Sequence, residues 1–184
     1  MKRTPLVLIA VLALLVPAAA LGAGSLPKPS DTTVVVPTSI AGVKLGMSEA
    51  KARAAWGGAN RGECTTSKET GSRRCEYGSF EGAGGYGFIG FEAGKVQSVV
   101  VYGGKGAGGE YVSSAAAPLM KIQTASGIGI GAAYSKLKSA YPKCKKGAVT
   151  GGSSFNYECA GKKGAEFNFG VLKNKVFAIA LVQP

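Results

Sequence analysis

The sequence contains two similar stretches, and each stretch carries one pair of cysteines. The first stretch begins at Gly42–Ser48 and the second at Gly127–Ala133, and in both a short helical pattern follows this start. An aromatic run and an apolar run come after the cysteines. The cysteines are Cys64 and Cys75 in the first stretch and Cys144 and Cys159 in the second. This arrangement predicts two tandem copies of one small unit, an architecture that favours a binding scaffold.

Residues 1–23 have the pattern of a secretory signal peptide. Lys2 and Arg3 form a basic start, an apolar run follows, and small residues come after Pro17. Cleavage after Ala20 fits the small-residue rule best, and cleavage near Ala23 is the alternative. An uncleaved membrane anchor agrees less well with the sequence, because Pro17 interrupts the apolar stretch. We therefore expect a secreted or extracytoplasmic protein.

The four cysteines predict two disulfides, because exported chains are oxidised and small units need covalent support. Four cysteines allow three pairings. The repeat favours Cys64–Cys75 and Cys144–Cys159, since each copy then closes its own short loop. Such a bridge contributes roughly 3 kcal/mol in the chain-entropy account. Metal binding is the rival interpretation, but the chain has no histidine and no CxxC spacing, so we expect no metal site.

The chain after the signal peptide divides into three parts. Residues 24–40 are rich in Pro, Ser and Thr, and the β-branched run from Thr32 to Val36 predicts a flexible linker that leads into an edge strand. Repeat 1 spans residues 41–111. Residues 112–184 hold a connector and repeat 2. Because units of about 65 residues are marginally stable alone, the two copies are expected to pack on each other.

Each repeat is predicted to hold a short helix and at least three strands. The first helix runs from the N-cap Ser48 to Trp56, and the second ends at Tyr141, where Pro142 stops it. Tight turns at residues 94–95 and 174–175 make neighbouring strands antiparallel. The expected strands are 73–80, 86–92, 96–102, 154–160, 165–171 and 175–182. The fold class is therefore α+β, with short helices packed on an antiparallel three- or four-stranded sheet in each disulfide-stapled repeat.

Alternation along the strands assigns two faces to each sheet. Phe167, Phe169 and Val171 are expected on the helix-covered face, and Tyr86 and Phe88 on the open face. The next strands are predicted to add Val96, Ser98, Val100 and Tyr102 to the open face in the first repeat, and Val176, Ala178 and Ala180 in the second. An open face of this kind either binds a partner or is covered by the other repeat.

Aromatic residues dominate the binding energy of protein interfaces. The candidate protein-binding residues are therefore Tyr86, Phe88, Val100 and Tyr102. The alternative is that the two repeats bury these rings between them.

The sequence argues against catalysis and against a cofactor. The absence of histidine excludes Ser/His and Cys/His nucleophile activation, and no spacing among the ten carboxylates singles out an acid–base pair. Two G-x-G-x-x-G matches, Gly82–Gly87 and Gly104–Gly109, lack the parallel βαβ unit of a dinucleotide site. We therefore expect a non-enzymatic protein without a small-molecule cofactor. Nucleic acid is not an expected partner either, because few basic residues flank the aromatic ones.

The charge is strongly basic, with twenty Lys and Arg against ten Asp and Glu after residue 23. Such a surface favours anionic partners, including cell-envelope polymers, although it also serves solubility. The clusters are Arg73-Arg74, Lys143 with Lys145-Lys146, and Lys162-Lys163. Two of these clusters flank the second cysteine pair, which suggests a local basic patch there.

Several of these features together resemble the β-lactamase inhibitory protein family. They are export, a mature length near 160 residues, one short-range cysteine pair per copy, and the Leu45–Ser48 turn into a helix. The Gly-Met-Ser helix start is also similar to that of the BamE-type outer-membrane assembly lipoproteins. Over residues 40–184 the resemblance implies a helix–loop–helix and a four-stranded sheet in each copy, with a concave, aromatic-rich surface that grips an enzyme. It also implies a hairpin that inserts an acidic group into the active site, for which Glu81 is the nearest acidic loop residue.

These observations lead to one expected function and two alternatives. We expect a secreted, non-enzymatic scaffold that binds another protein. The first alternative is inhibition of a secreted or periplasmic hydrolase such as a β-lactamase, and the second is association with an anionic cell-envelope polymer through lysines and arginines. Added salt distinguishes them, because it weakens polymer binding steeply and leaves an aromatic interface largely intact.

Overall fold

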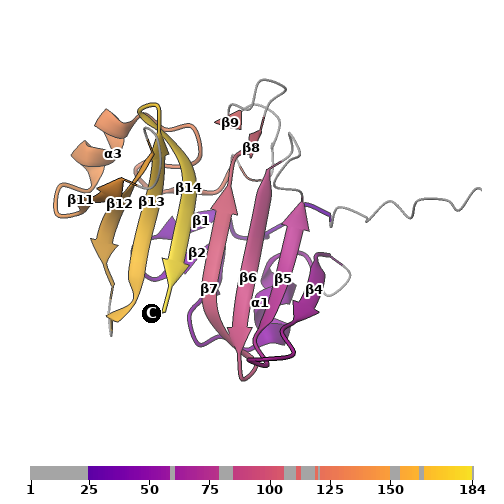
Figure 1. Cartoon of the computed structure of the whole chain (residues 1–184). Helices are drawn as coiled ribbons and strands as arrows, with labels where there is room; N and C mark the ends of the chain where they lie inside the picture. The colour runs from indigo at the N-terminus through magenta and orange to yellow at the C-terminus, as the bar shows by residue number, and fades with distance from the viewer. Residues whose placement is uncertain are drawn as a thin grey trace, which may run out of the picture.

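The computed structural model describes residues 25–58, 61–78, 85–105, 111–112, 119, 121–149, 154–161 and 164–183 (Figure 1). The expected signal peptide and Glu81 lie outside these residues. The described helices are α1 (Glu49–Ala55) and α3 (Tyr134–Ala140). The strands are β1 (Thr33–Val35), β2 (Ser39–Ile40), β3 (Val43–Lys44), β4 (Glu63–Thr66), β5 (Arg73–Gly78), β6 (Tyr86–Glu92), β7 (Lys95–Tyr102), β8 (Gly104–Lys105), β9 (Tyr111–Val112), β10 (Gln123–Thr124), β11 (Lys145–Val149), β12 (Phe155–Ala160), β13 (Glu166–Leu172) and β14 (Lys175–Val182). None of the helices in these ranges is long and apolar enough to cross a membrane.

Eight strands form one continuous antiparallel sheet in the order β11-β12-β13-β14-β7-β6-β5-β4 (Figure 1). Each half of the sheet is a series of neighbouring strands, and the halves join where β7 pairs with β14. Val100 lies opposite Ala180 at the centre of this junction. The predicted α+β class with antiparallel pairing is therefore confirmed. The sequence left open whether the two halves share one sheet, and the β7–β14 pairing shows that they do.

A smaller sheet has the order β10-β1-β2-β3. In it, β1 pairs with β10 in parallel and with β2 in antiparallel orientation. The prediction of an edge strand at Thr32–Val36 is therefore wrong, because β10, which is distant in sequence, supplies a second partner. The segment before β1 contacts the end of α1, where the amide of Lys28 donates a hydrogen bond to the carbonyl of Trp56 over 3.1 Å.

Both helices and the smaller sheet lie on one face of the eight-stranded sheet (Figure 1). A seven-residue helix is too short to be stable alone, so burial of apolar side chains holds each helix in place. Trp56, directly after α1, and Leu137, in α3, are fully buried. The other large side chains with no exposed surface in this core are Tyr77, Phe167, Phe169, Ile40, Ile89, Leu119, Ile122, Ile128, Ile179 and Leu181.

The two helices begin in the same way, each beside the hairpin turn of its own half. The amide of Glu49 donates to the carbonyl of Gly94 over 3.1 Å, and the amide of Tyr134 donates to the carbonyl of Asn174 over 2.8 Å. Ser48 occupies the N-cap position of α1, but its side chain makes no capping hydrogen bond. Backbone contacts to the turn therefore fix the helix starts. The tandem-repeat interpretation agrees with this likeness and stays a prediction.

Both disulfides have the predicted pairing. Cys64 and Cys75 lie directly opposite each other on β4 and β5 and are bonded. Cys144 precedes β11 and is bonded to Cys159 of β12. Each bridge therefore ties the outermost strand of one half to the rest of the sheet, where only one neighbouring strand provides hydrogen bonds.

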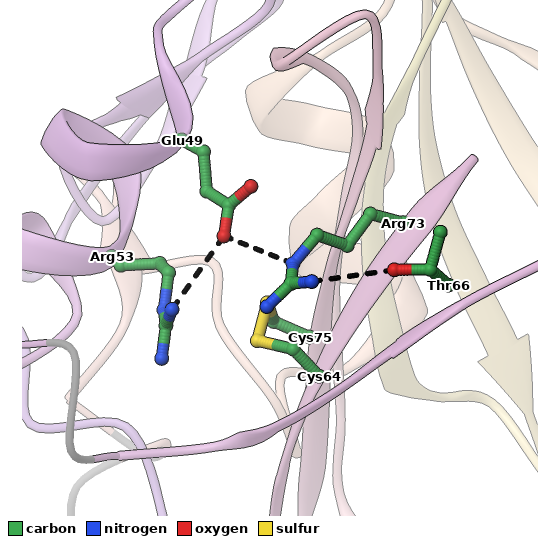
Figure 2. The surroundings of a disulfide bond; sticks show 6 residues. All are labelled: Glu49, Arg53, Cys64, Thr66, Arg73 and Cys75. Carbon is green, nitrogen blue, oxygen red and sulfur yellow. Dashed lines mark hydrogen bonds and ion pairs between the residues drawn. A yellow bond between two sulfur atoms is a disulfide. The ribbon is translucent and has the colours of Figure 1, made fainter. Parts of the chain in front are cut away.

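Ion pairs next to the first disulfide attach α1 to the sheet (Figure 2). The carboxylate of Glu49 lies 3.1 Å from Nε of Arg73 on β5 and 3.5 Å from Nη1 of Arg53. Arg73 also donates from Nη1 to the hydroxyl of Thr66 on β4 over 3.3 Å. One carboxylate thus links the helix, two strands and the disulfide region.

Irregularities in the β6–β7 and β13–β14 pairings overturn two predicted side-chain positions. After Gly90 the register with β7 shifts, so Val96 lies opposite Phe91 on the helix-covered face. A matching shift after Gly170 places Val176 on the same face. Both valines are 1% exposed. Their predicted place on the open face is wrong because an extra residue in one strand reverses the alternation.

The segments next to the cysteines also differ from expectation. The sequence predicts a loop at each cysteine pair before the strands begin. In the structure, residues 63–66 and 145–149 of these segments form the outer strands β4 and β11. Their polar side chains lack the apolar alternation that reveals a strand. The resemblance implies two helices before each sheet half. In the described ranges α1 precedes the first half and α3 precedes the second, and Leu119 is also helical. The short strands β1, β2, β3 and β10 lie before these two named helices.

The packing of Trp56 depends on Gly87 of β6. A Cβ atom at residue 87 would lie 3.1 Å from Cζ3 of Trp56 and 3.2 Å from the carbonyl oxygen of Val100. Trp56 also contacts Tyr77, the cross-strand partner of Gly87, in an edge-on arrangement with ring centroids 5.1 Å apart.

We predict that Gly87→Ala lowers the free energy of unfolding by about 1–3 kcal/mol in urea denaturation, because the ring and the backbone must move apart. Thr65→Ala, at an exposed outer-strand position, should cost about 0.5 kcal/mol or less. Equal stability of Gly87→Ala and the original protein would contradict this packing.

Candidate binding face

The candidate site is the open face, by which we mean the face of the eight-stranded sheet opposite the two helices. Cross-strand pairing places eight residues in one row along it: Lys145, Glu158, Asn168, Ala180, Val100, Phe88, Glu76 and Glu63. The row is polar at both ends and apolar at the junction of the two halves. A partner would therefore meet an apolar centre with a polar rim, which is the usual anatomy of a protein interface.

Four rings form a continuous aromatic row beside this centre. Phe88 and Tyr86 of β6 have ring centroids 6.1 Å apart, Tyr86 and Tyr102 of β7 are 6.0 Å apart, and Tyr102 and Phe177 of β14 are 6.3 Å apart. These separations lie in the range of favourable aromatic pairs, each of which contributes about 0.5–1.5 kcal/mol beyond area burial. The aromatic row crosses the junction, so it joins the two halves of the sheet on the open face.

Arg74 of β5 is fixed at one end of the aromatic row. Its guanidinium carbon lies 3.8 Å from the ring centroid of Phe88, and Nη2 donates a hydrogen bond to the hydroxyl of Tyr86 over 2.7 Å. Nε forms an ion pair with Glu76 over 2.9 Å. Phe88, Tyr86 and Glu76 therefore hold the planar guanidinium group in place before another protein binds. A guanidinium held in this way retains donors for a partner and loses little entropy on binding.

The four rings differ in how much surface they offer. Tyr86 is 7% exposed and Val100 is 4% exposed, whereas Phe88, Tyr102 and Phe177 are half-buried. Burial is the largest cause that raises the pKa of Tyr86 to about 12, and a hydrogen bond to the Glu76 carboxylate acts in the same direction. The Arg74 cation opposes this shift. Tyr86 therefore stays a neutral phenol that supports the surface, and its half-buried neighbours offer the contact area.

The structure brings together four of the five residues that the sequence singled out. Tyr86, Phe88, Val100 and Tyr102 all lie on the open face. The fifth, Glu81, lies outside the described residues. Their role in binding stays a prediction.

Sequence reasoning missed two members of this surface, Arg74 and Phe177. Alternation from the buried Cys75 would have placed Arg74 on the open face. The register shift in β13–β14 brings Phe177 there, and alternation alone does not reveal it.

The other half of the open face is polar. Glu158, Glu166 and Asn168 line an open depression of about 260 Å³, together with Lys143 and Lys145. Two carboxylates and two ammonium groups leave it without a net charge. The side-chain oxygen of Asn168 is buried and has no hydrogen-bond partner among the described residues. This polar half limits the apolar contact area to the junction and the first half.

One cluster near the first disulfide has a spacing that could hold a metal ion. Oxygen of Glu49 and the sulfurs of Cys64 and Cys75 lie within 4.8 Å of one another. Both sulfurs belong to the disulfide, so neither is a thiolate ligand (Figure 2). The carboxylate is already paired with two guanidinium groups. The cluster is therefore a structural contact of α1 and does not have the donor chemistry of a metal site.

Comparison with known proteins gives little to add to this geometry. No family model matches the sequence, and no curated protein matches it. A solved structure of an extracellular protein containing a SCP domain, from Bacillus anthracis str. Ames, is similar with a TM-score of 0.44 and 12% sequence identity. The match covers 76% of this chain and 44% of that protein, so the chain spans less than half of its length.

The contact of Arg74 with Tyr86 gives a pH-dependent prediction. Tyr86→Phe removes the hydroxyl that accepts the hydrogen bond from Arg74, and it should lower the free energy of unfolding by about 1 kcal/mol at neutral pH. Because the folded-state pKa of Tyr86 lies above the ordinary value of 10.0, the folded protein holds this proton more tightly than the unfolded chain. The contribution to stability is complete below pH 10 and is lost as the pH rises towards 12.

Urea denaturation across this pH range measures the effect. Stability should fall less steeply with pH in Tyr86→Phe than in the original protein. Burial also raises the pKa of Tyr77 and Tyr157, but both residues are present in each protein and their effect cancels in the comparison. Identical pH dependence in the two proteins would contradict the assignment of Tyr86.

Proposed function

We propose that the protein is an extracytoplasmic, non-enzymatic scaffold that binds another protein through the aromatic row and Arg74. The observation that carries this proposal is the continuous row of rings on the open face, with a guanidinium fixed at its end. Tyrosine and arginine are enriched among residues that dominate binding energy. A rigid sheet holds them in place, so little ordering cost accompanies binding.

The two disulfides support an extracytoplasmic location. Cysteines 64 and 75, and cysteines 144 and 159, are all bonded, and such bonds persist in oxidising compartments. The basic, apolar and small-residue pattern at the start of the chain agrees with export.

The engagement of the carboxylates supports binding over catalysis. Glu76, the carboxylate nearest to the aromatic row, is paired with Arg74, and Glu49 is paired with two arginines. Both carboxylates are therefore occupied by guanidinium partners, which leaves them poorly placed to act on a bound substrate. With no histidine in the chain, the open face offers contact area and hydrogen-bond donors in place of reactive groups.

A capture experiment tests the proposal. The purified, oxidised protein is immobilised and exposed to the culture supernatant and envelope fraction of its source cells at low and high salt, and retained proteins are identified by mass spectrometry. We predict a discrete partner that stays bound at high salt. Phe88→Ala and Arg74→Ala should each weaken its binding by about tenfold or more in calorimetry with the purified partner.

Glu166→Gln, on the polar half of the open face, is the matched control and should leave the affinity unchanged. Thermal unfolding of each variant checks that the fold is intact. Retention of full affinity by both Phe88→Ala and Arg74→Ala would refute the aromatic row as the binding surface.

The hydrolase-inhibitor alternative predicts that the same face binds an enzyme. Adding the protein to a β-lactamase and following hydrolysis of a chromogenic substrate tests it directly. Inhibition that Phe88→Ala abolishes would identify a hydrolase as the partner. If the protein does not inhibit the enzyme, the β-lactamase alternative is wrong. The capture experiment then tests protein binding by itself.

A further inference from the structure

Positive charge is distributed very unequally between the two halves of the chain. Residues 41–111 contain nine Lys and Arg against seven Asp and Glu, whereas residues 112–184 contain ten lysines against two glutamates. Three ion pairs of the described ranges lie in the first half and are made by Glu49 and Glu76. The second half therefore holds most of the net charge, and asymmetry of this kind indicates an anionic partner.

Several of these lysines surround α3. Lys136 and Lys138 belong to the helix, Lys146 lies on the neighbouring outer strand β11, and Lys175 pairs with Ala133 just before the helix. Lys136, Lys138, Lys146 and Lys175 are all exposed. The two glutamates of this half line the depression on the open face, with Lys143 and Lys145 beside them. On the α3 side, the described part of the second half therefore contributes lysines and no glutamate.

An aromatic cluster lies among these lysines. The rings of Tyr134 and Phe155 are in edge-to-face contact with centroids 5.0 Å apart. Nζ of Lys138 lies 5.0 Å from the Tyr134 ring, and Nζ of Lys146 lies 4.4 Å from the Phe155 ring. A cation–π contact at an exposed site is weak, about 0.5–1 kcal/mol, so it positions the ammonium groups without neutralising them.

A recess opens beside the Tyr134 ring. It has a volume of about 340 Å³ and is lined by Ala133, Tyr134, Ser135, Lys138 and Asn174. Its side chains combine a half-buried aromatic ring, a hydroxyl, an amide and an ammonium group. The ring can pack on the apolar face of a sugar, the hydroxyl and amide can bond sugar hydroxyls, and the ammonium can pair with an acidic substituent. We call it the Tyr134 recess.

We propose that the α3 side of the second half binds an anionic glycan, a polysaccharide with repeated carboxylate or phosphate groups. The Tyr134 recess holds one sugar unit, and Lys138 and Lys146 pair with the acidic groups along the polymer. This surface is separate from the aromatic row, because α3 lies on the opposite face of the sheet (Figure 1).

The same features argue for a glycan over a bilayer. Insertion into lipid requires exposed large apolar side chains beside the cations. Where the structure describes side-chain burial, Val35 is the exposed large apolar side chain, and it lies in β1, outside this surface. The surface instead offers polar groups and a partly covered ring.

Binding to defined polymers tests this proposal. The purified, oxidised protein is titrated by calorimetry with polygalacturonate, with poly(glycerol phosphate) and with neutral dextran, at two salt concentrations. We expect salt-sensitive binding to one or both anionic polymers and none to dextran. The double variant Lys138→Gln/Lys146→Gln should weaken binding by roughly tenfold, since each lysine–anion contact accounts for about a threefold change in polyanion affinity.

Two further variants separate a built site from general charge. Lys44→Gln/Lys95→Gln removes the same charge from exposed strand positions of the first half and should leave affinity within about twofold. Asn174→Gly removes the recess amide at a residue with φ of 62°, which glycine adopts easily, and should weaken binding about threefold.

Equal loss in the two double lysine variants, or no binding to either anionic polymer, would overturn the proposal. Equally tight binding to duplex DNA or to phosphatidylglycerol vesicles would also overturn it, because charge alone would then explain the affinity. None of these outcomes bears on the aromatic row, which is tested at high salt with a protein partner.

Discussion

The pairing of β7 with β14 is the interaction on which the rest of the structure depends. These strands are the last strands of their halves and are far apart in sequence, so their pairing closes a long loop at an entropic cost. It removes two exposed edge strands, which are a liability for a small sheet. It also places both helices on one face of a single sheet and merges the two open faces into one surface (Figure 1).

The side chains that meet at this junction determine the chemistry of the open face. Tyr102 and Phe177 come from different halves and meet only because β7 and β14 are neighbours. Val100 and Ala180 lie opposite each other where the halves join. The candidate binding surface is therefore a property of the joined sheet. The Tyr134 recess belongs to one half and involves α3, so the two surfaces differ in location and in their response to salt.

Alternation and the repeat predicted a substantial part of the candidate site. Tyr86, Phe88, Val100 and Tyr102 were placed on one face because their strands alternate regularly up to the irregular register near Gly90. Val96, Val176 and Phe177 were misplaced or missed, because a one-residue register shift reverses the face of every residue on one side of it. The sequence left open whether these rings are exposed or buried, and Tyr86 is buried because its neighbours come from other strands.

The sequence by itself determined the local elements: a disulfide pair closed within each half, and two hairpin turns, which lie at residues 93–94 and 173–174, one residue before the predicted 94–95 and 174–175. These features depend on residues close together in the chain, whose preferences are strong and short-ranged. Only the tertiary structure decided that one sheet forms, that β10 pairs with β1, and that Phe177 joins the aromatic row. Those outcomes depend on contacts between distant segments, whose gain in packing must exceed the entropy of ordering the whole chain.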